Sequence, residues 1–240
     1  MCPVKRVGIV TAIAREVTFV IDRLEPKNRD ERNHRTLFSG DFEGKQVSII
    51  ISGIGKRRAR EATDALISKA MPDIVISAGF SGALTRGLSV GDIVIPKLVT
   101  LDGEDRSHRV ARLPGITTNE TGYEKILTAR RFIAHPEEKE ALFNRSGAVA
   151  VDMESFFVAE ACAARQTLFF AIRAISDGAT AIIPPPQAIV DNAANLMRKE
   201  AARYCVKNPH MILPTIMFMV NLTIASRALG RSLLSILRLL

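Results

Sequence analysis

Two kinds of hydrophobic pattern alternate along residues 7–208. Short apolar runs bounded by glycine, proline or polar residues are typical of buried strands, whereas apolar positions three or four apart are typical of helices. These patterns predict strands at 7–13, 72–84, 90–100, 124–134, 147–153 and 167–176. They predict helices at 15–24, 56–69, 136–146, 154–165 and 184–208. Two more strands are predicted in 36–52, joined by a turn at Glu43 and Gly44, and a polar loop in 102–122.

Strands that alternate with helices predict the fold class. This order favours an α/β fold of three layers, in which a mostly parallel mixed sheet lies between helices on both faces. A chain of 240 residues is long enough for one such domain. We therefore expect a single α/β domain at residues 1–211, followed by a helical tail at 212–240.

The tail has an amphipathic pattern of its own. Its apolar sequence is interrupted by Arg227, Arg231 and Arg238, which is too much charge for an ordinary membrane-spanning helix. On a helix with ~100° per residue, these arginines form one stripe opposite the leucines. That pattern is typical of a helix that lies on a membrane surface, and it equally fits a helix that packs on the domain or on a partner subunit.

Composition and charge narrow the class of protein. Hydrophobic residues make up 47% of the chain and aromatic residues 5%, which suits an aliphatic core. Three widely spaced cysteines predict neither a disulfide framework nor a metal cluster, and the N-terminus does not resemble a signal peptide, so we expect a cytoplasmic location. The net charge of +8 attracts anionic partners. Its basic residues are scattered and have few aromatic neighbours, so no nucleic-acid partner is expected.

Acidic residues are the main candidates for chemistry. The sequence has no dinucleotide fingerprint, phosphate-binding loop, nucleophile elbow or zinc-ligand spacing, so no redox cofactor or metal is expected. Glu16 follows the first predicted strand, Asp152 and Glu154 follow a later one, and Asp177 ends the last. Ligand sites in parallel sheets lie at the carboxyl ends of strands, so these acids are expected to converge on one rim. Taken alone, each acid is better explained as a solvated turn residue or a helix cap.

Five blocks of the sequence resemble one family. They are "VGIVTAIAREV", "SGIGKRRA", "DIVISAGFSGAL..GLSVGDIVIP", "VAVDMES" and "FAIRAISD", in that order. Together they are similar to the nucleoside phosphorylases, and particularly to the methylthioadenosine/S-adenosylhomocysteine nucleosidases. The resemblance covers roughly residues 5 to 205. It implies a phosphorylase-like catalytic domain that forms a homo-oligomer and cleaves the N-glycosidic bond of a purine nucleoside.

The resemblance also implies roles for particular residues. Glu16 matches the glutamate that activates water, and Asp177 matches the aspartate that helps to protonate N7 of the purine. Glu154 matches the acid that binds the ribose hydroxyls. The remaining implied substrate-binding residues are Met153 at the sugar, Phe132 and Ile133 at the purine, and Ser176.

The sequence departs from the family pattern at the glycine turn expected to end the 72–84 strand. Phe80, Ser81 and Gly82 stand in this turn, where the nucleosidases commonly have a serine in place of Phe80. The arginine that binds phosphate in hexameric phosphorylases is also missing before it. Water is therefore favoured as the nucleophile, while phosphate stays open as a co-substrate, bound by Arg15, Arg57 or Arg58.

The basic charge, the tail and a short segment between Asp92 and Asp152 resemble the hopanoid-associated branch of the family. That resemblance implies a nucleoside with a lipid 5′ group, adenosylhopane, cleaved by a protein at the inner face of the membrane that residues 212–240 contact. Three alternatives remain. They are a phosphate-dependent purine nucleoside phosphorylase, a methylthioadenosine/S-adenosylhomocysteine nucleosidase, and a nucleoside-binding, membrane-associated protein without catalysis.

Overall fold

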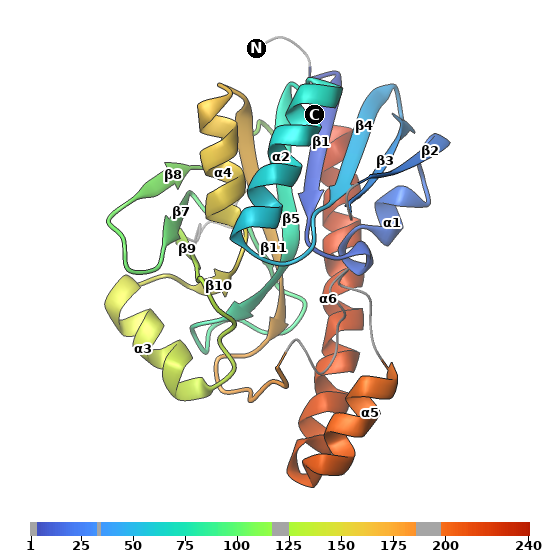
Figure 1. Cartoon of the computed structure of the whole chain (residues 1–240). Helices are drawn as coiled ribbons and strands as arrows, with labels where there is room; N and C mark the ends of the chain where they lie inside the picture. Colours follow the sequence, from blue (N-terminus) through green and yellow to red (C-terminus); the bar gives the residue numbers. More distant parts are fainter. Residues whose placement is uncertain (1–3, 33–34, 117–124, 186–197) are drawn as a thin grey trace.

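The chain folds around one mixed sheet in a computed structural model that describes residues 4–32, 35–116, 125–185 and 198–240 (Figure 1). Its strands are β1 (Arg6–Thr11), β2 (Glu25–Arg32), β3 (Arg35–Phe42), β4 (Lys45–Ile51), β5 (Ile74–Ala83), β6 (Ile93–Val94), β7 (Leu98–Leu101), β8 (Ser107–Arg109), β9 (Lys125–Thr128), β10 (Ala150–Asp152) and β11 (Leu168–Asp177). The helices are η1 (Ala14–Glu16), α1 (Thr18–Ile21), α2 (Lys56–Ala70), α3 (Pro136–Ser146), α4 (Ser155–Ala164), α5 (Arg198–Lys207), η3 (Pro209–Met211) and α6 (Ile212–Leu239).

The central strand β5 organises the sheet. Its first half pairs in parallel with β1, nearly its whole length pairs in parallel with β11, and its last residues pair antiparallel with β10. The path through the sheet is β2-β3-β4-β1-β5-β10-β9-β7-β8, with β11 joining β5 to β6. Because β1 and β11 run parallel to β5, their carboxyl ends lie toward the same edge of the sheet as that of β5, and the short antiparallel strand β10 pairs with β5 at this edge. Because ligand sites lie at such ends, this topology places the site.

Helices cover both faces of the sheet. Helices α2 and α4 pack against each other on one face, and α6 runs along the other face against β11 (Figure 1). Strands β1, β5 and β11 are almost completely buried, which explains their nearly continuous apolar sequence. The expected mixed α/β sheet between helices is confirmed, with five of the ten strand pairs parallel among the described residues.

Several element predictions need correction. The helix predicted at 15–24 is reduced to η1 and α1, and the polar segment Glu25–Arg32 is a strand, β2, that pairs with β3 at the sheet edge. Pro96 separates the strand predicted at 90–100 into β6 and β7, since proline lacks the N–H that a ladder needs. Only the first part of the strand predicted at 124–134 is observed as a strand, β9, and the loop predicted at 102–122 contains the short strand β8. Within the predicted helix at 184–208, α5 is observed, and 186–197 lie outside the described residues.

Nearly the whole predicted tail forms one helix, α6, whose two halves differ in their surroundings. From Ala225 onward most of its apolar side chains pack into the main core, and Leu229 and Leu233 are completely buried. The arginines at 227, 231 and 238 are exposed on the opposite side, as the amphipathic pattern predicted. The first half of α6 extends past the sheet beside α5 (Figure 1). Helix α6 is therefore part of the same packed body as the sheet over its C-terminal half.

Candidate active site

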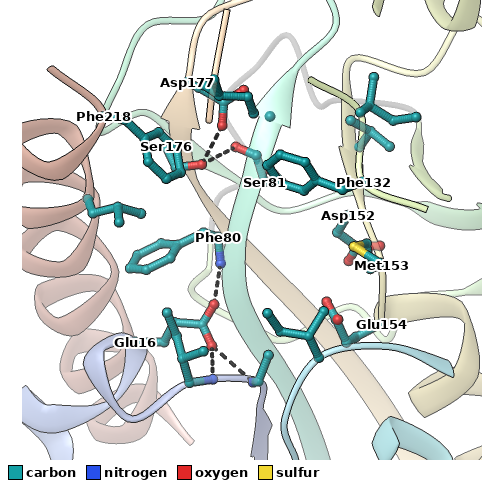
Figure 2. A pocket seen from close by; sticks show the side chains of 18 of the residues that line it. Glu16, Phe80, Ser81, Phe132, Asp152, Met153, Glu154, Ser176, Asp177 and Phe218 are labelled. Carbon is teal, nitrogen blue, oxygen red and sulfur yellow. Dashed lines mark hydrogen bonds between the residues drawn. The ribbon is translucent and has the colours of Figure 1, made fainter. Parts of the chain in front are cut away.

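A cavity of about 150 Å³ opens where the carboxyl ends of β1, β5, β10 and β11 meet. All ten residues predicted for the site line it: Glu16, Phe80, Ser81, Gly82, Phe132, Ile133, Met153, Glu154, Ser176 and Asp177. Figure 2 shows Glu16 and Glu154 at one end of the cavity and Asp177 at the other, with aromatic side chains between them. The structure thus brings the predicted residues together, while their roles stay predictions.

Glu16 is held by hydrogen bonds to both of its carboxylate oxygens. Oε2 accepts bonds from the hydroxyl of Thr11 and from the backbone N–H groups of Ala12 and Ile13, both at 3.0 Å. Oε1 accepts a bond from the N–H of Phe80 at 2.9 Å (Figure 2). Burial raises the pKa of Glu16 above its usual value, and these hydrogen bonds oppose the shift. The side chain is therefore fixed in direction.

Two glycines allow the acids to approach strand β5. A Cβ atom at Gly79 would lie 2.9 Å from Oε1 of Glu16, and one at Gly82 would lie 2.8 Å from Oδ2 of Asp177. The predicted glycine turn is wrong, because β5 continues as a strand through both glycines to Ala83. Its glycines serve close packing against carboxylates instead of a change in chain direction.

Glu154 and its neighbour Asp152 have different tasks. Glu154 stands at the N-cap position of α4 but makes no side-chain cap; its Oε1 accepts a bond from the N–H of Gly55 at 2.8 Å, at the start of α2. Burial, and then the nearby Asp152 carboxylate, raise the pKa of Glu154 to about 8. Asp152 is the residue that caps the helix, since its Oδ2 accepts a bond from the N–H of Ser155 at 3.2 Å.

Arg173 on β11 is a buried cation below the cavity. Its Nε donates to Oδ2 of Asp152 at 2.8 Å. One terminal nitrogen donates to the carbonyl oxygens of Ser77 and Ile172, at 2.8 and 2.9 Å. The other donates to the hydroxyl oxygens of Ser77 and Ser155, at 2.8 and 2.7 Å. All five N–H donors of the guanidinium are thereby used, so Arg173 ties β5, α4 and β10 together.

Asp177 sits at the opposite end of the cavity and is 3% exposed. Its Oδ1 accepts a bond from the hydroxyl of Ser176 at 2.6 Å, and Oδ2 accepts one from Nζ of Lys139 at 2.5 Å. The hydroxyl of Ser81, also on this wall, is buried without a partner among the described residues. A ligand with a hydrogen-bonding group would satisfy it, since buried polar atoms normally have partners.

A second, smaller cavity of about 10 Å³ lies behind the first. Glu16, Glu154 and Arg173 all line it, together with Thr11 and Ser52. This volume is about what one water molecule needs, and the walls supply several polar partners for it. The two glutamates therefore stand between a water-sized site and the larger cavity.

Four important residues were missed by the sequence reasoning. Arg173 and Lys139 lie inside an apolar strand and an apparently ordinary helix, where charge at an inward-facing position was the available signal. Phe218 and Leu222 of α6 line the larger cavity (Figure 2), although the tail was expected to lie outside the domain. Only the folded chain shows which side of α6 faces the site.

The arginines considered for phosphate binding are not part of the cavity walls. Arg15, Arg57 and Arg58 line neither cavity. The arginine at the larger cavity is Arg131, which pairs with Glu138 at 2.9 Å. Within the described parts of the chain, no three His, Cys, Asp or Glu residues form a group that could hold a metal ion.

Comparison with known sequences identifies relatives over most of the chain. A profile of the phosphorylase superfamily matches residues 6–119 and 115–207. The 5′-methylthioadenosine/S-adenosylhomocysteine nucleosidase of Staphylococcus aureus (strain MRSA252) is 30% identical over 195 residues, which cover 71% of this chain and 86% of that protein. The protein of the same name from Bacillus subtilis (strain 168) is 29% identical over 197 residues, covering 72% and 85%.

Solved structures share the fold. The 5′-methylthioadenosine/S-adenosylhomocysteine nucleosidase of Neisseria meningitidis, in complex with methylthio-immucillin-A, aligns with a TM-score of 0.75 and 23% identity over 98% of this chain and 100% of its own. Futalosine hydrolase of Helicobacter pylori strain 26695 aligns with a TM-score of 0.76 and 20% identity over 99% of both chains. Such coverage reaches into α6, so the helix has a structural counterpart in these proteins. With the sequence profile matching more than half of its length, the chain belongs to the phosphorylase superfamily.

Proposed function

We propose that this protein cleaves the N-glycosidic bond of a purine nucleoside, with water as the nucleophile. The observation that carries the proposal is the arrangement of three carboxylates around one cavity, with Glu16 and Glu154 at one end and Asp177 at the other (Figure 2). Cleavage of this bond needs an activated nucleophile on one side and a proton for the leaving base on the other. Relatives with nucleosidase names support this chemistry.

The sugar would bind between the two glutamates. An ionised Glu154 can accept hydrogen bonds from two ribose hydroxyls and so orient the ring. The water-sized cavity beside Glu16 and Glu154 would hold the attacking molecule. Glu16, whose pKa is raised by burial, would accept its proton as the hydroxide adds to the sugar. Met153 lines the cavity beside Glu154 and would pack on the ring.

The purine would bind at the end that contains Asp177. Phe132 and Ile133 line this region with Phe80, and flat aromatic rings suit a planar base. Asp177 lines the same cavity as the unpartnered hydroxyl of Ser81 and accepts a hydrogen bond from Ser176. These groups would recognise the polar edge of the base and pass a proton to N7.

Water is favoured over phosphate as the nucleophile because, among the residues that the structure describes, no arginine near the site is available to bind a phosphate. The buried Arg173 has all of its N–H donors engaged, so it would have to break existing bonds to hold a phosphate. The three surface arginines considered for that task lie outside both cavities. A phosphate-dependent phosphorylase therefore ranks second.

The 5′ substituent would point toward α6. Phe218 and Leu222 give this wall an apolar surface, and Met217 and Val220, on neighbouring positions of the helix, are more than half exposed. An apolar 5′ group could follow this surface out of the cavity. Together with the sequence resemblance to the hopanoid-associated branch, this supports adenosylhopane as the specific substrate and methylthioadenosine or S-adenosylhomocysteine as alternatives.

Adenine release tests the proposal. Adenosine, methylthioadenosine, S-adenosylhomocysteine and a lipid-linked adenosine would each be incubated with the protein, with and without inorganic phosphate. We expect release without phosphate, a preference for an apolar 5′ group, and a ~10²-fold or larger loss in Glu16→Gln, because general base catalysis contributes about that much. Glu137→Gln, an exposed carboxylate of α3, is the matched control and should retain activity.

The other possible outcomes would each support a different function or mechanism. Release that requires phosphate would move the assignment to a phosphorylase. Binding of the nucleosides without release of any base would establish the non-catalytic, nucleoside-binding alternative. Full activity of Glu16→Gln would remove this residue from the mechanism.

A further inference from the structure

Helix α3 buries a lysine against Asp177, the proposed proton donor of the site. The side chain of Lys139 is 0% exposed, and its Nζ donates to Oδ2 of Asp177 at 2.5 Å and to the carbonyl oxygen of Gly178 at 2.8 Å. Lysine is almost never fully buried unless it is paired, and a buried ammonium is costly without an anion. Lys139 therefore occupies a buried position of α3 where an apolar residue would be expected, which suggests that the ion pair has a function.

The pair has a definite orientation. Lys139 and Leu142 are the buried residues on the inner side of α3, and Lys139 does not line the cavity whereas Asp177 does. The ammonium thus contacts the carboxylate from behind and does not reach the substrate. On its other oxygen Asp177 accepts a bond from Ser176, and the absent side chain of Gly82 leaves room for the carboxylate beside β5.

This arrangement affects where the proton for the leaving base is stored. An aspartate that accepts a bond from a buried ammonium is stabilised as a carboxylate. Lys139 and Asp177 form such an ion pair. The pair as a unit still holds one transferable proton, on Nζ, and the hydrogen bond at 2.5 Å is the direct route for it to reach Oδ2.

We propose that Lys139 is a positioning residue that supplies, through Asp177, the proton for the departing purine; the inference rests on the proposed nucleosidase function. As the bond from C1′ to the base breaks, its electron pair moves to the base. Oδ2 of Asp177 accepts a proton from the ammonium, which becomes a neutral amine, and Asp177 passes this proton to N7. Water adds hydroxide to C1′ and gives its proton to Glu16. Solvent then returns a proton to Lys139 and removes one from Glu16, so the sum is nucleoside plus water to base plus sugar.

A double-mutant cycle tests the coupling. Lys139→Met keeps the length of the side chain and removes its charge, Asp177→Asn removes the acid, and the double variant buries neither charge. We expect Lys139→Met to lower kcat for adenine release about 10²-fold, the scale of general acid catalysis. Since Lys139 acts only through Asp177, adding Lys139→Met to Asp177→Asn should cost less than about threefold more. Lys207→Met, on the exposed surface of α5, is the control for the substitution itself.

Binding of a 7-deaza adenine nucleoside, which has no N7 to protonate, separates chemistry from structure. Its Kd should stay within about threefold of the wild-type value in Lys139→Met, because the cavity wall is unchanged.

A parallel loss of binding and kcat, multiplicative losses in the cycle, or a Lys139→Met variant with wild-type kcat would overturn the assignment. The double variant covers the case in which Lys139→Met alone does not fold, since it leaves no unpaired charge. A wild-type protein that releases no purine would refute the proposed function, whereas an active wild type with any of these results would refute only the role of Lys139.

Discussion

At the scale of single residues, the acids of the site differ in what compensates their charge. Asp152 is paired with the buried guanidinium of Arg173, and Asp177 with the buried ammonium of Lys139. Glu154 forms no such ion pair with the residues that the structure describes, and its Oε1 accepts one backbone hydrogen bond from Gly55. A carboxylate that is buried without a cation favours its protonated form, which is why the pKa of Glu154 rises to about 8. Burying Glu154 in its ionised form therefore lowers the stability of the fold, and a ligand that donates hydrogen bonds to the carboxylate would offset this loss.

Glu154→Gln should therefore change the pH dependence of stability. Because the folded state raises the pKa of Glu154 from 4.5 to about 8, folding favours the protonated acid. The wild type should match the variant below about pH 4.5, lose stability relative to it as the pH rises to about 8, and keep a constant deficit above that. Thermal unfolding of both proteins from pH 4 to 9 measures this difference. A difference that does not vary with pH would contradict the raised pKa.

At the scale of elements, α6 supports the turn that carries Glu16. The hydroxyl of Ser226 donates to the carbonyl oxygen of Arg15 at 2.6 Å, and the guanidinium of Arg15 donates to Thr223 at 2.5 Å. One turn further along, Gly230 lies so close to α1 that a Cβ atom would be 2.6 Å from Cβ of Phe19. The C-terminal half of α6 thus fixes η1 and α1 from outside the sheet.

Gly230→Val should force α6 and α1 apart. We expect it to lower the free energy of unfolding by ~1–3 kcal/mol, the usual cost of overpacking, and to reduce turnover because η1 carries Glu16. Arg231→Val introduces the same side chain at the next, exposed position and should stay within about 0.5 kcal/mol of the wild type. Urea denaturation with parallel activity assays compares the two. Equal stability of the two variants would contradict this prediction, because it would show that the close contact between α1 and α6 is not needed for stability.

At the scale of the whole molecule, the first half of α6 leaves an apolar surface uncovered within the described structure. Its exposed residues are Ile212, Leu213, Ile216, Met217, Val220 and Ile224. By length and composition Pro209–Leu239 is apolar enough to cross a membrane, but a third of its most apolar window is buried, and the second half packs on β11. Such a surface on a basic protein suits the proposed contact with an anionic membrane or with a second subunit.

Leu213→Gln, Met217→Gln and Val220→Gln combined should test the proposed membrane contact. These side chains share one exposed face and line neither cavity, so we expect weaker sedimentation with anionic liposomes and unchanged cleavage of a soluble nucleoside. Unchanged liposome binding would argue against this face. Light scattering on the same variant distinguishes the alternative, since conversion of an oligomer to a monomer would assign the surface to subunit contact. Deleting 212–240 is unsuitable for this purpose, because it would expose the core around Leu229.

The sequence by itself determined the features of this protein that depend on local pattern, namely most strands and helices and the positions of the acids at strand ends. Strand runs such as Ile74–Ala83 and Leu168–Asp177 were recognisable because burial on both faces requires continuous apolar sequence. The hairpin of β3 and β4 was recognisable from its turn at Glu43 and Gly44. The acids were found because strand ends are where such a sheet places its ligands. These signals depend only on neighbours along the chain.

Tertiary structure decided what each charge contacts. The edge strand Glu25–Arg32 has a polar sequence, and only its pairing with β3 makes it a strand. Likewise, Lys139 lies 38 positions from Asp177 along the sequence, so nothing local predicts their ion pair. Whether Phe218 faces the cavity depends on where α6 docks. A side chain's electrostatic environment is set by groups distant in sequence, and the packing of the sheet and its helices is what brings those groups together.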